Sequence, residues 1–260
     1  MTNFIDYLLG GFSNGAVIAL MALALVLVWR STRMVNFAQV GQAMFTTYIA
    51  LTVQQSTGNW VLALVVALLA GSILGVVVFF LVIRPVKNSD TTGAIIATFG
   101  VLIALQAGAG MIWGGDPEGF VPPVDNAGLE IGGRIWPVSL YDLLVLAVTA
   151  VLVIGLTLLF TKTSLGLSMR ASAFNPEVAR LSGVRVNRML ITGWAIAGAT
   201  GAIGGVLIAP FSTISPNSFD ILLVFAFTAA VVGALSGVVF VCEKPPVGMP
   251  SLWCNRGVRI

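Results

Sequence analysis

Amide and hydroxyl side chains that could contact a solute gather in one apolar stretch near the start of the chain. Residues 35–53 read VNFAQVGQAMFTTYIALTV, in which polar side chains interrupt an otherwise hydrophobic run. For any one of them an interhelical hydrogen bond is a sufficient explanation, and that alternative stays open. Several together need a shared polar surface, so we predict a substrate path lined by Asn36, Gln39, Gln42 and Thr46.

A second group of functional side chains lies in the basic stretch SMRASAFNPEVARLSGVRVNR. Asn175 is a good helix N-cap, Pro176 suits the first helical position, and Glu177 suits the positive end of the helix dipole. Gly183 is a natural helix stop. These signals predict a short helix from Pro176 to Ser182, although on these features alone a solvated loop that only sets topology explains the stretch equally well.

No enzyme signature appears in the sequence. It contains no histidine, and its two cysteines, Cys242 and Cys254, match no metal or redox spacing, which excludes zinc hydrolysis and histidine-based catalysis. A P-loop that binds ATP requires a lysine directly after a glycine, and none of the lysines in this chain follows one. Asp142 and Asp220 fall at the predicted ends of apolar runs, so no mid-membrane charge marks a proton relay. We therefore expect no catalytic residue, no metal ligand and no cofactor bound by this chain.

The elements that must position these residues are transmembrane helices. The chain is 58% hydrophobic and only 9% charged, which is typical of a polytopic membrane protein. Runs long enough to cross about 30 Å of hydrocarbon recur at residues 12–29, 35–53, 60–83, 93–113, 140–161, 189–210 and 221–241. The sequence thus predicts an all-α bundle of about seven spans, with residues 1–241 as one transmembrane domain. The second run is the most polar, so a re-entrant or broken element lining a cavity is the alternative to a full crossing.

Small residues recur at every fourth position in most of these runs. Gly71 with Gly75, and Ala197 with Gly201 and Gly205, are examples. This spacing lets helix backbones approach closely in lipid, so we expect most of these glycines to be packing positions.

Positive charge falls in alternate connections between the expected helices. The residues are Arg30, Arg33, Arg84, Lys87, Lys162, Arg170, Arg180, Arg185 and Arg188. The positive-inside rule assigns these connections, including the loop 162–188, to the cytoplasm. The connection 114–139 carries four acidic residues against one arginine and is expected on the other side, together with the N-terminus.

The motifs resemble those of one known family. Glu177, Ala179 and Gly183 reproduce the Glu-Ala-Ala-x-x-x-Gly loop of ABC-transporter permeases, with Val178 in place of the central alanine. Two longer stretches, GLSMRASAFNPEVARLSGVRVNRMLITGWAIAGATGAIGGVL and GAVIALMALALVLVWRSTRMVNFAQVGQAMFTTYIA, are similar to the branched-chain amino acid (Liv-type) permeases of ABC importers. The resemblance covers about residues 10–237.

The resemblance implies a permease subunit of a bacterial inner membrane that imports branched-chain amino acids. The implied partners are a second permease subunit, two cytoplasmic ATPase subunits that bind ATP and Mg²⁺, and a periplasmic or extracellular substrate-binding protein. The loop 162–188 would contain a coupling helix lying in a cleft of the ATPase. The residues expected to transmit force or to meet the ATPase surface are Glu177, Ala179, Gly183, Arg170, Arg180 and Arg185.

The sequence departs from the family pattern at two places. Where the family commonly has Asn-Phe-Ala-His-Gly, Gln39 and Val40 precede Gly41. Residues 242–260 are polar and rich in proline, so we expect a non-spanning tail that resembles a frame change or truncation in place of a further span.

Other functions stay open at this point. A urea or short-chain amide ABC permease would share these motifs. A sodium-coupled carrier or channel would work without ATPases, because carbonyls and hydroxyls of broken helices can bind sodium. A third alternative is a membrane scaffold that transports nothing, in which the motif of Glu177, Ala179 and Gly183 would have no function.

Overall fold

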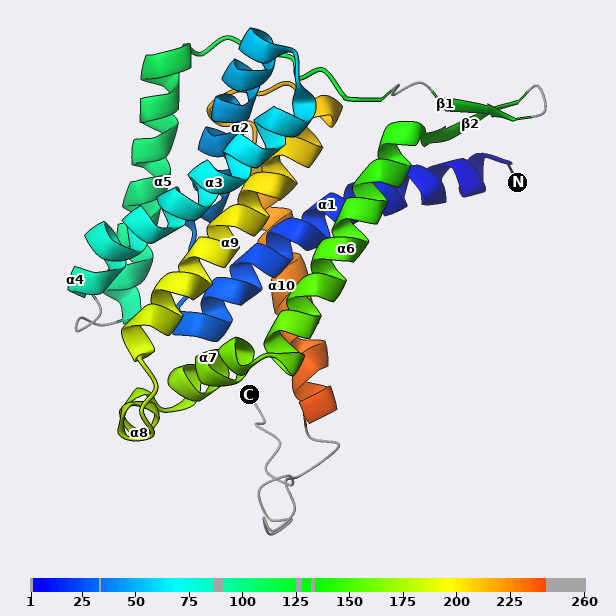
Figure 1. Cartoon of the computed structure of the whole chain (residues 1–260). Coiled ribbons are helices and arrows are strands. Elements are labelled where there is room, and N and C mark those ends of the chain that lie inside the picture. The colour runs from blue at the N-terminus through cyan, green and yellow to red at the C-terminus, as the bar shows by residue number, and fades with distance from the viewer. Residues whose placement is uncertain (1, 33, 87–90, 125–127, 132–133, 242–260) are drawn as a thin grey trace.

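A computed structural model describes residues 2–32, 34–86, 91–124, 128–131 and 134–241 as a bundle of long helices (Figure 1). The elements are α1 (Thr2–Thr32), α2 (Ala38–Thr57), α3 (Trp60–Val78), the π-helix η1 (Phe79–Ile83), α4 (Arg84–Val86), α5 (Thr91–Trp113), β1 (Gly128–Ile131), β2 (Arg134–Ser139), α6 (Leu140–Lys162), α7 (Ser164–Phe174), α8 (Pro176–Leu181), α9 (Val186–Ile208), the 3-10 helix η2 (Ala209–Phe211) and α10 (Asp220–Val241). The seven apolar runs predicted from the sequence correspond to α1, α2, α3 with η1, α5, α6, α9 and α10. The predicted helical membrane bundle is confirmed.

Length and hydropathy show that this is a multi-pass membrane protein. Among the described residues, the helical segments long and apolar enough to cross a membrane are Trp60–Leu81, Gly93–Trp113, Leu140–Lys162 and Val186–Phe211. α1 and α10 contain the shorter apolar stretches Asn14–Trp29 and Asp220–Gly233. Seven crossings and an outer N-terminus stay predictions. The tail expected at residues 242–260 lies outside the described part of the chain.

One hairpin adds local β-structure to the connection between α5 and α6. β1 pairs antiparallel with β2, with Glu130 opposite Ile135. β2 leads directly into α6, where the Ser139 hydroxyl accepts a hydrogen bond from the Asp142 amide at 3.0 Å. The Asp142 carboxylate in turn accepts from the Ser139 amide at 2.8 Å, which completes a capping box. The bundle itself is all-α, as predicted.

α9 is the central helix, and α1, α2 and α3 pack along it. Gly71 and Gly75 of α3 face Trp194 and Gly198 of α9 so closely that a Cβ on any of the three glycines would overlap the opposing backbone. Close backbone approach provides the van der Waals contact that holds helices together in lipid. The packing role expected for Gly71 and Gly75 is confirmed, and Gly198 supplies the other half of the contact.

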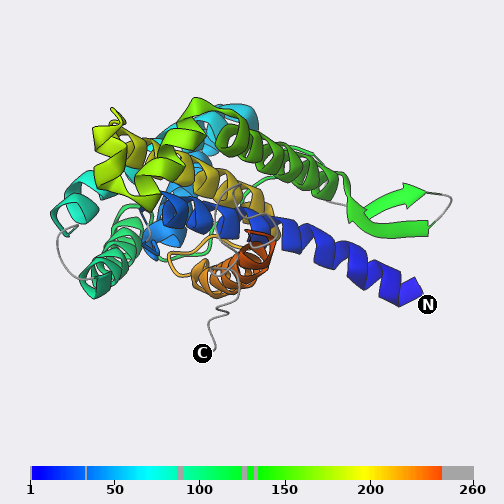
Figure 2. The ribbon, with the colours of Figure 1, turned by 90° about the horizontal axis from the view of Figure 1, so that it is seen from below.

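The connections with the expected cytoplasmic charges share one end of the bundle. α7 and α8 cross the lower end in Figure 1, below the end of α1 and the start of α9. The turn between α2 and α3 and the ends of α5 and α9 lie at the opposite end. Figure 2 looks at the lower end and shows α5 and α10 as separate helices along one edge of the bundle.

Candidate functional site

The coupling loop predicted from the sequence folds as two short helices, α7 and α8, that meet at Asn175. The Asn175 Oδ1 accepts hydrogen bonds from the amides of Glu177 at 3.0 Å and Val178 at 3.1 Å. Pro176 takes the first helical position, where a missing amide costs nothing. The N-terminal signals seen in the sequence therefore act as predicted.

The end of α8 is a Schellman motif centred on Gly183. The Gly183 amide donates to the Arg180 carbonyl at 3.0 Å, and the Val184 amide donates to the Ala179 carbonyl at 2.9 Å. Gly183 has a φ of 83°, in the left-handed region that L side chains rarely adopt. The helix ends at Leu181, one residue earlier than predicted, and the predicted stop at Gly183 is confirmed.

The six predicted coupling residues divide between two faces of this segment. Ala179 is buried in a cluster that includes Phe160, Met169 and Leu190. The side chains of Glu177, Arg170, Arg180 and Arg185 are exposed, as is Gly183. Ala179 therefore fastens α8 to the bundle, whereas the acid and the three arginines are available to another molecule.

The sequence analysis missed three exposed apolar side chains on the same segment. Phe174 is 86% exposed, Leu181 is 89% exposed, and Val178 is also exposed. Val178 and Leu181 are three residues apart and so share a face of α8. The sequence did contain a signal for these residues, which is the grouping of apolar side chains on an otherwise polar connection. Exposed apolar patches of this kind mark contact surfaces.

The predicted substrate-path residues lie together in the interior. Asn36 Nδ2 donates to Gln39 Oε1 at 3.3 Å, and Gln39 Nε2 donates to the carbonyl of Ala197 in α9 at 2.9 Å. Asn36 Oδ1 also accepts from the Ala38 amide at 3.1 Å, at the start of α2. A Cβ at Gly201 would overlap the Gln39 amide, so this glycine makes room for it. Asn36 and Gln39 thus join α2 to α9, whatever role they have in transport.

Gln42 differs from its neighbours in having unused hydrogen-bonding capacity. The Thr46 hydroxyl donates to the carbonyls of Gln42 and Ala43, both at 2.9 Å. Gln42 is only 1% exposed, and among the described residues neither its side-chain nitrogen nor its side-chain oxygen has a partner. A buried amide without partners is costly, so it is available to a bound molecule.

α2 is continuous, yet it begins inside the bundle. Gln39 bonds to Ala197, which lies midway along α9, and the Phe37 ring stacks on Phe99 in the first half of α5 with centroids 4.4 Å apart. The second apolar run is therefore not broken within its helix. Its irregular start at residues 34–37 lies at depth, which transporters tolerate where backbone is covered by protein or lines a cavity.

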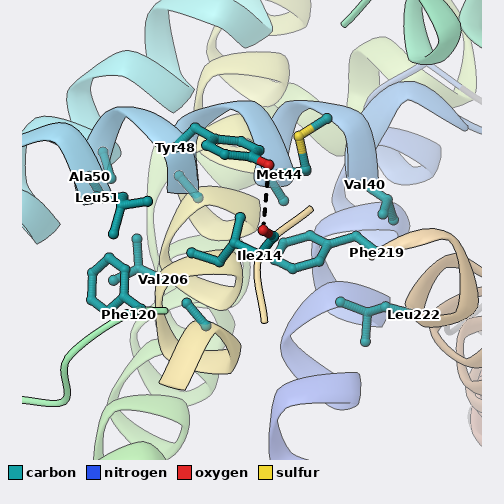
Figure 3. Close-up of a cluster of buried hydrophobic side chains, with 14 of the residues drawn as sticks. Val40, Met44, Tyr48, Ala50, Leu51, Phe120, Val206, Ile214, Phe219 and Leu222 are labelled. Atoms are coloured by element: carbon teal, nitrogen blue, oxygen red, sulfur yellow. Dashed lines mark hydrogen bonds between the residues drawn. The ribbon is translucent and has the colours of Figure 1, made fainter. Parts of the chain in front are cut away.

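α10 also begins inside the bundle. Figure 3 shows the segment before it, with Ile214 and Phe219 against the α2 residues Val40, Met44 and Tyr48. The Tyr48 hydroxyl donates to the Ile214 carbonyl at 3.5 Å. The backbone of Ile214 further exchanges two hydrogen bonds, of 2.8 and 2.9 Å, with the connection that follows α5.

Asp220, the first residue of α10, was expected at the end of a membrane span, but it contacts a residue well inside another span. Its Oδ1 accepts a hydrogen bond from Gln106 Nε2 at 2.7 Å. Gln106 lies within the membrane-crossing segment Gly93–Trp113, about two helical turns, or about 10 Å, before its end. An exposed carboxylate thus lies alongside the interior of a span.

Comparison with known proteins identifies the group to which this helical arrangement belongs. Residues 7–242 match the family described as the branched-chain amino acid transport system permease component. The chain belongs to this permease family. Its members are transport permeases of ABC importers, which work with other ABC components.

Relatives in this permease family are similar over most of the chain. A probable branched-chain amino acid transport permease protein LivH of Methanocaldococcus jannaschii is 31% identical, over 86% of this chain and 71% of the relative. The high-affinity permease protein BraD of Pseudomonas aeruginosa is 26% identical over 91% of this chain and 81% of the relative. The high-affinity permease protein LivH of Escherichia coli K12 is 26% identical over 90% of this chain and 80% of the relative. No solved structure matches the chain.

Proposed function

We propose that this permease is a subunit of an ATP-driven importer of branched-chain amino acids. The main support is the geometry of α8, a helix of six residues with side-chain and backbone caps at its two ends. Together with Phe174 at the end of α7, it presents the apolar side chains of Val178 and Leu181 among exposed arginines at one end of the bundle. A rigid, partly apolar projection suits insertion into a cleft of a partner protein. The names of the three relatives support the substrate class.

The proposed complex contains a second permease subunit, two cytoplasmic ATPase subunits and an extracellular or periplasmic substrate-binding protein. ATP and Mg²⁺ would bind to the ATPases and not to this chain. α8 would transmit ATPase closure to the bundle through Ala179, which is buried, and Gly183, which ends the helix. The proposed location is a bacterial inner membrane, with α7 and α8 on the cytoplasmic side.

We also propose that the stripe of Asn36, Gln39, Gln42 and Thr46 borders the substrate path. Gln42 is the strongest member because its amide is buried and has no partner among the described residues. A neutral amide can both donate to a carboxylate and accept from an ammonium group, which fits a zwitterionic solute.

Two other transport functions make different predictions. A urea or short-chain amide permease would need the same ATPases but would not transport leucine. A sodium-coupled carrier or channel would give ion-dependent flux with the purified chain alone. Transport assays in vesicles separate the three functions. The vesicles hold either the chain alone or the complete complex, and uptake of leucine or urea is measured with ATP or with a sodium gradient.

Gly183→Val tests the coupling assignment. A β-branched residue with a φ near that of Gly183 strains the end of α8, although no atom beyond its two chain neighbours lies within 4 Å of where its Cβ would stand. We expect the variant to enter the membrane but to lose ATP-driven uptake. Gly183→Asn is the matched control, because asparagine tolerates the left-handed conformation and should retain most of the activity.

The outcome against this assignment is equally clear. A Gly183→Val complex that retains its ATPase subunits and imports leucine at the parental rate would show that α8 is not the coupling helix. Loss of the protein from the membrane in both variants would instead show that Gly183 serves folding.

A further inference from the structure

Two side-chain contacts join α5 to α10, whose main packing partners are different helices. α5 packs along α2, whereas α10 packs mainly along α1 and makes a smaller contact with α2. The first contact is the hydrogen bond of 2.7 Å between Gln106 and Asp220. In the second, the Phe37 ring lies between Phe99 of α5, with centroids 4.4 Å apart, and Phe227 of α10, at 5.7 Å. We call the strip between these two contacts the α5–α10 seam.

The two contacts are matched in spacing along both helices. Seven residues separate Phe99 from Gln106, and seven separate Asp220 from Phe227. Seven residues are about two helical turns, or about 10 Å, so each pair lies on one face of its helix. Ile103 and Val224, which fall between the pairs on the same faces, are both exposed. The seam therefore has a polar end, an apolar middle and an aromatic end.

We propose that the α5–α10 seam binds the transported solute, with the Asp220 carboxylate receiving its ammonium group. The solute class is a zwitterionic amino acid with a branched apolar side chain, which would lie on Ile103, Val224 and the phenylalanine rings. Asp220 suits this role because an ionisable group placed inside a membrane protein is expensive unless it meets an opposite charge. This inference rests on the proposed import of amino acids.

The Gln106 hydrogen bond positions the carboxylate. It occupies Asp220 Oδ1 and does not engage Oδ2, which an ammonium donor could contact. Gln106 itself is neutral and so does not neutralise the carboxylate. The seam reaches the start of α2 through its N-cap residue Phe37, whereas Gln39 of α2 faces α9. The seam and the polar stripe therefore lie on different sides of the start of α2, so they would contact the solute at different points of its path and are tested independently.

Asp220→Asn and Gln106→Leu separate charge from hydrogen bonding. Asparagine keeps an oxygen that can accept from Gln106, but it loses the charge and carries an NH2 donor in place of the second carboxylate oxygen. With the complete complex in vesicles, we expect Asp220→Asn to lower leucine uptake by about tenfold or more, because bonds to charged groups are the stronger kind. Gln106→Leu, which keeps the charge, should lower uptake only about two- to fivefold. Co-purification and ATP hydrolysis check that both complexes assemble.

A labelling experiment reads solute binding without transport. Val224→Cys is made in a chain whose Cys242 and Cys254 are replaced by serine, and its reaction with a thiol reagent is timed in the assembled complex without ATP. We expect leucine to slow the labelling, 4-methylpentanoate to have little effect because it lacks the amino group, and Asp220→Asn to remove the protection. Val151→Cys, exposed on α6, is the control that leucine should not protect.

Three results would overturn the seam proposal: normal uptake by Asp220→Asn, equal losses in the two substitutions, or labelling of Val224→Cys that leucine does not slow. Failure of the parental complex to import leucine with ATP would count against the proposed function instead. The labelling result would then still decide whether the seam binds an amino acid.

Discussion

The α8 segment and the contact between α3 and α9 use glycine for different physical reasons. Gly183 provides a left-handed backbone conformation, and the space where its Cβ would stand is open. Gly198 lies within a regular helix, and its missing Cβ makes room for the carbonyl oxygen of Gly71. The first requirement comes from neighbours in sequence and the second from another helix. Changes at α8 should therefore affect coupling, and changes at the α3–α9 contact should affect folding.

The largest effect on folding is expected from Gly198→Ala. The added methyl would overlap backbone of α3, which cannot turn aside as a side chain can. Overpacking of this kind destabilises by about 1–3 kcal/mol, and here α3 and α9 would have to separate. Thermal unfolding of the detergent-purified chain, with its yield from membranes, measures the loss.

Gly155→Ala is the matched control for this comparison. Gly155 also lies within a long helix, α6, but apart from its chain neighbours and the nearby backbone of that helix no atom comes within 4 Å of where its Cβ would stand. Alanine should there gain up to about 1 kcal/mol from helix propensity alone. Equal stability of the two variants would contradict the close contact between α3 and α9.

A smaller effect should distinguish Gln39 from Gln42. Gln39→Met removes the bonds to the Ala197 carbonyl and to Asn36 Nδ2 and should cost about 1–2 kcal/mol of stability, close to the usual value for two hydrogen bonds. Gln42→Met removes an amide that has no partner among the described residues, so stability should be unchanged or slightly higher. Unfolding and leucine uptake are measured on both variants.

The two glutamines then report on the predicted substrate path. If Gln42→Met lowers uptake without lowering stability, Gln42 contacts the solute, whereas a loss of stability would reveal a bond within the bundle. If Gln39→Met impairs uptake more than its stability loss explains, Gln39 also belongs to the path.

Local and periodic features were predictable from the sequence. The helical bundle follows from the apolar runs, and the start and stop of α8 follow from Asn175, Pro176 and Gly183, which act through their own backbone. The packing role of Gly71 was also predictable, because small residues at this spacing suit close helix contacts. In each case the signal lies within one turn of helix or one apolar run.

Features that depend on contacts between distant segments were not predictable. Asp220 appeared to mark a span end, and only its bond to Gln106 places it beside the interior of α5. The burial of Ala179 and the exposure of Leu181 depend on how α8 lies against the bundle. Asn36 and Gln39 were similarly ambiguous, because a polar residue in an apolar run gives no indication of which helix it faces.

The smallest effect is expected from Asn175→Ala, which removes the N-cap of α8 and leaves its other contacts in place. The amides of Glu177 and Val178 lose their acceptor, at a cost of about 1 kcal/mol, which corresponds to about a fivefold increase in local opening. Hydrogen exchange of the α8 amides should quicken to that extent, and uptake should fall modestly because the bundle is intact. Asn175→Asp keeps an acceptor oxygen and should exchange like the parent. Equal exchange in the alanine variant and the parent would mean that α8 is held by the burial of Ala179 instead of by its caps, and α8 would then depend on tertiary contacts as the α3–α9 contact does.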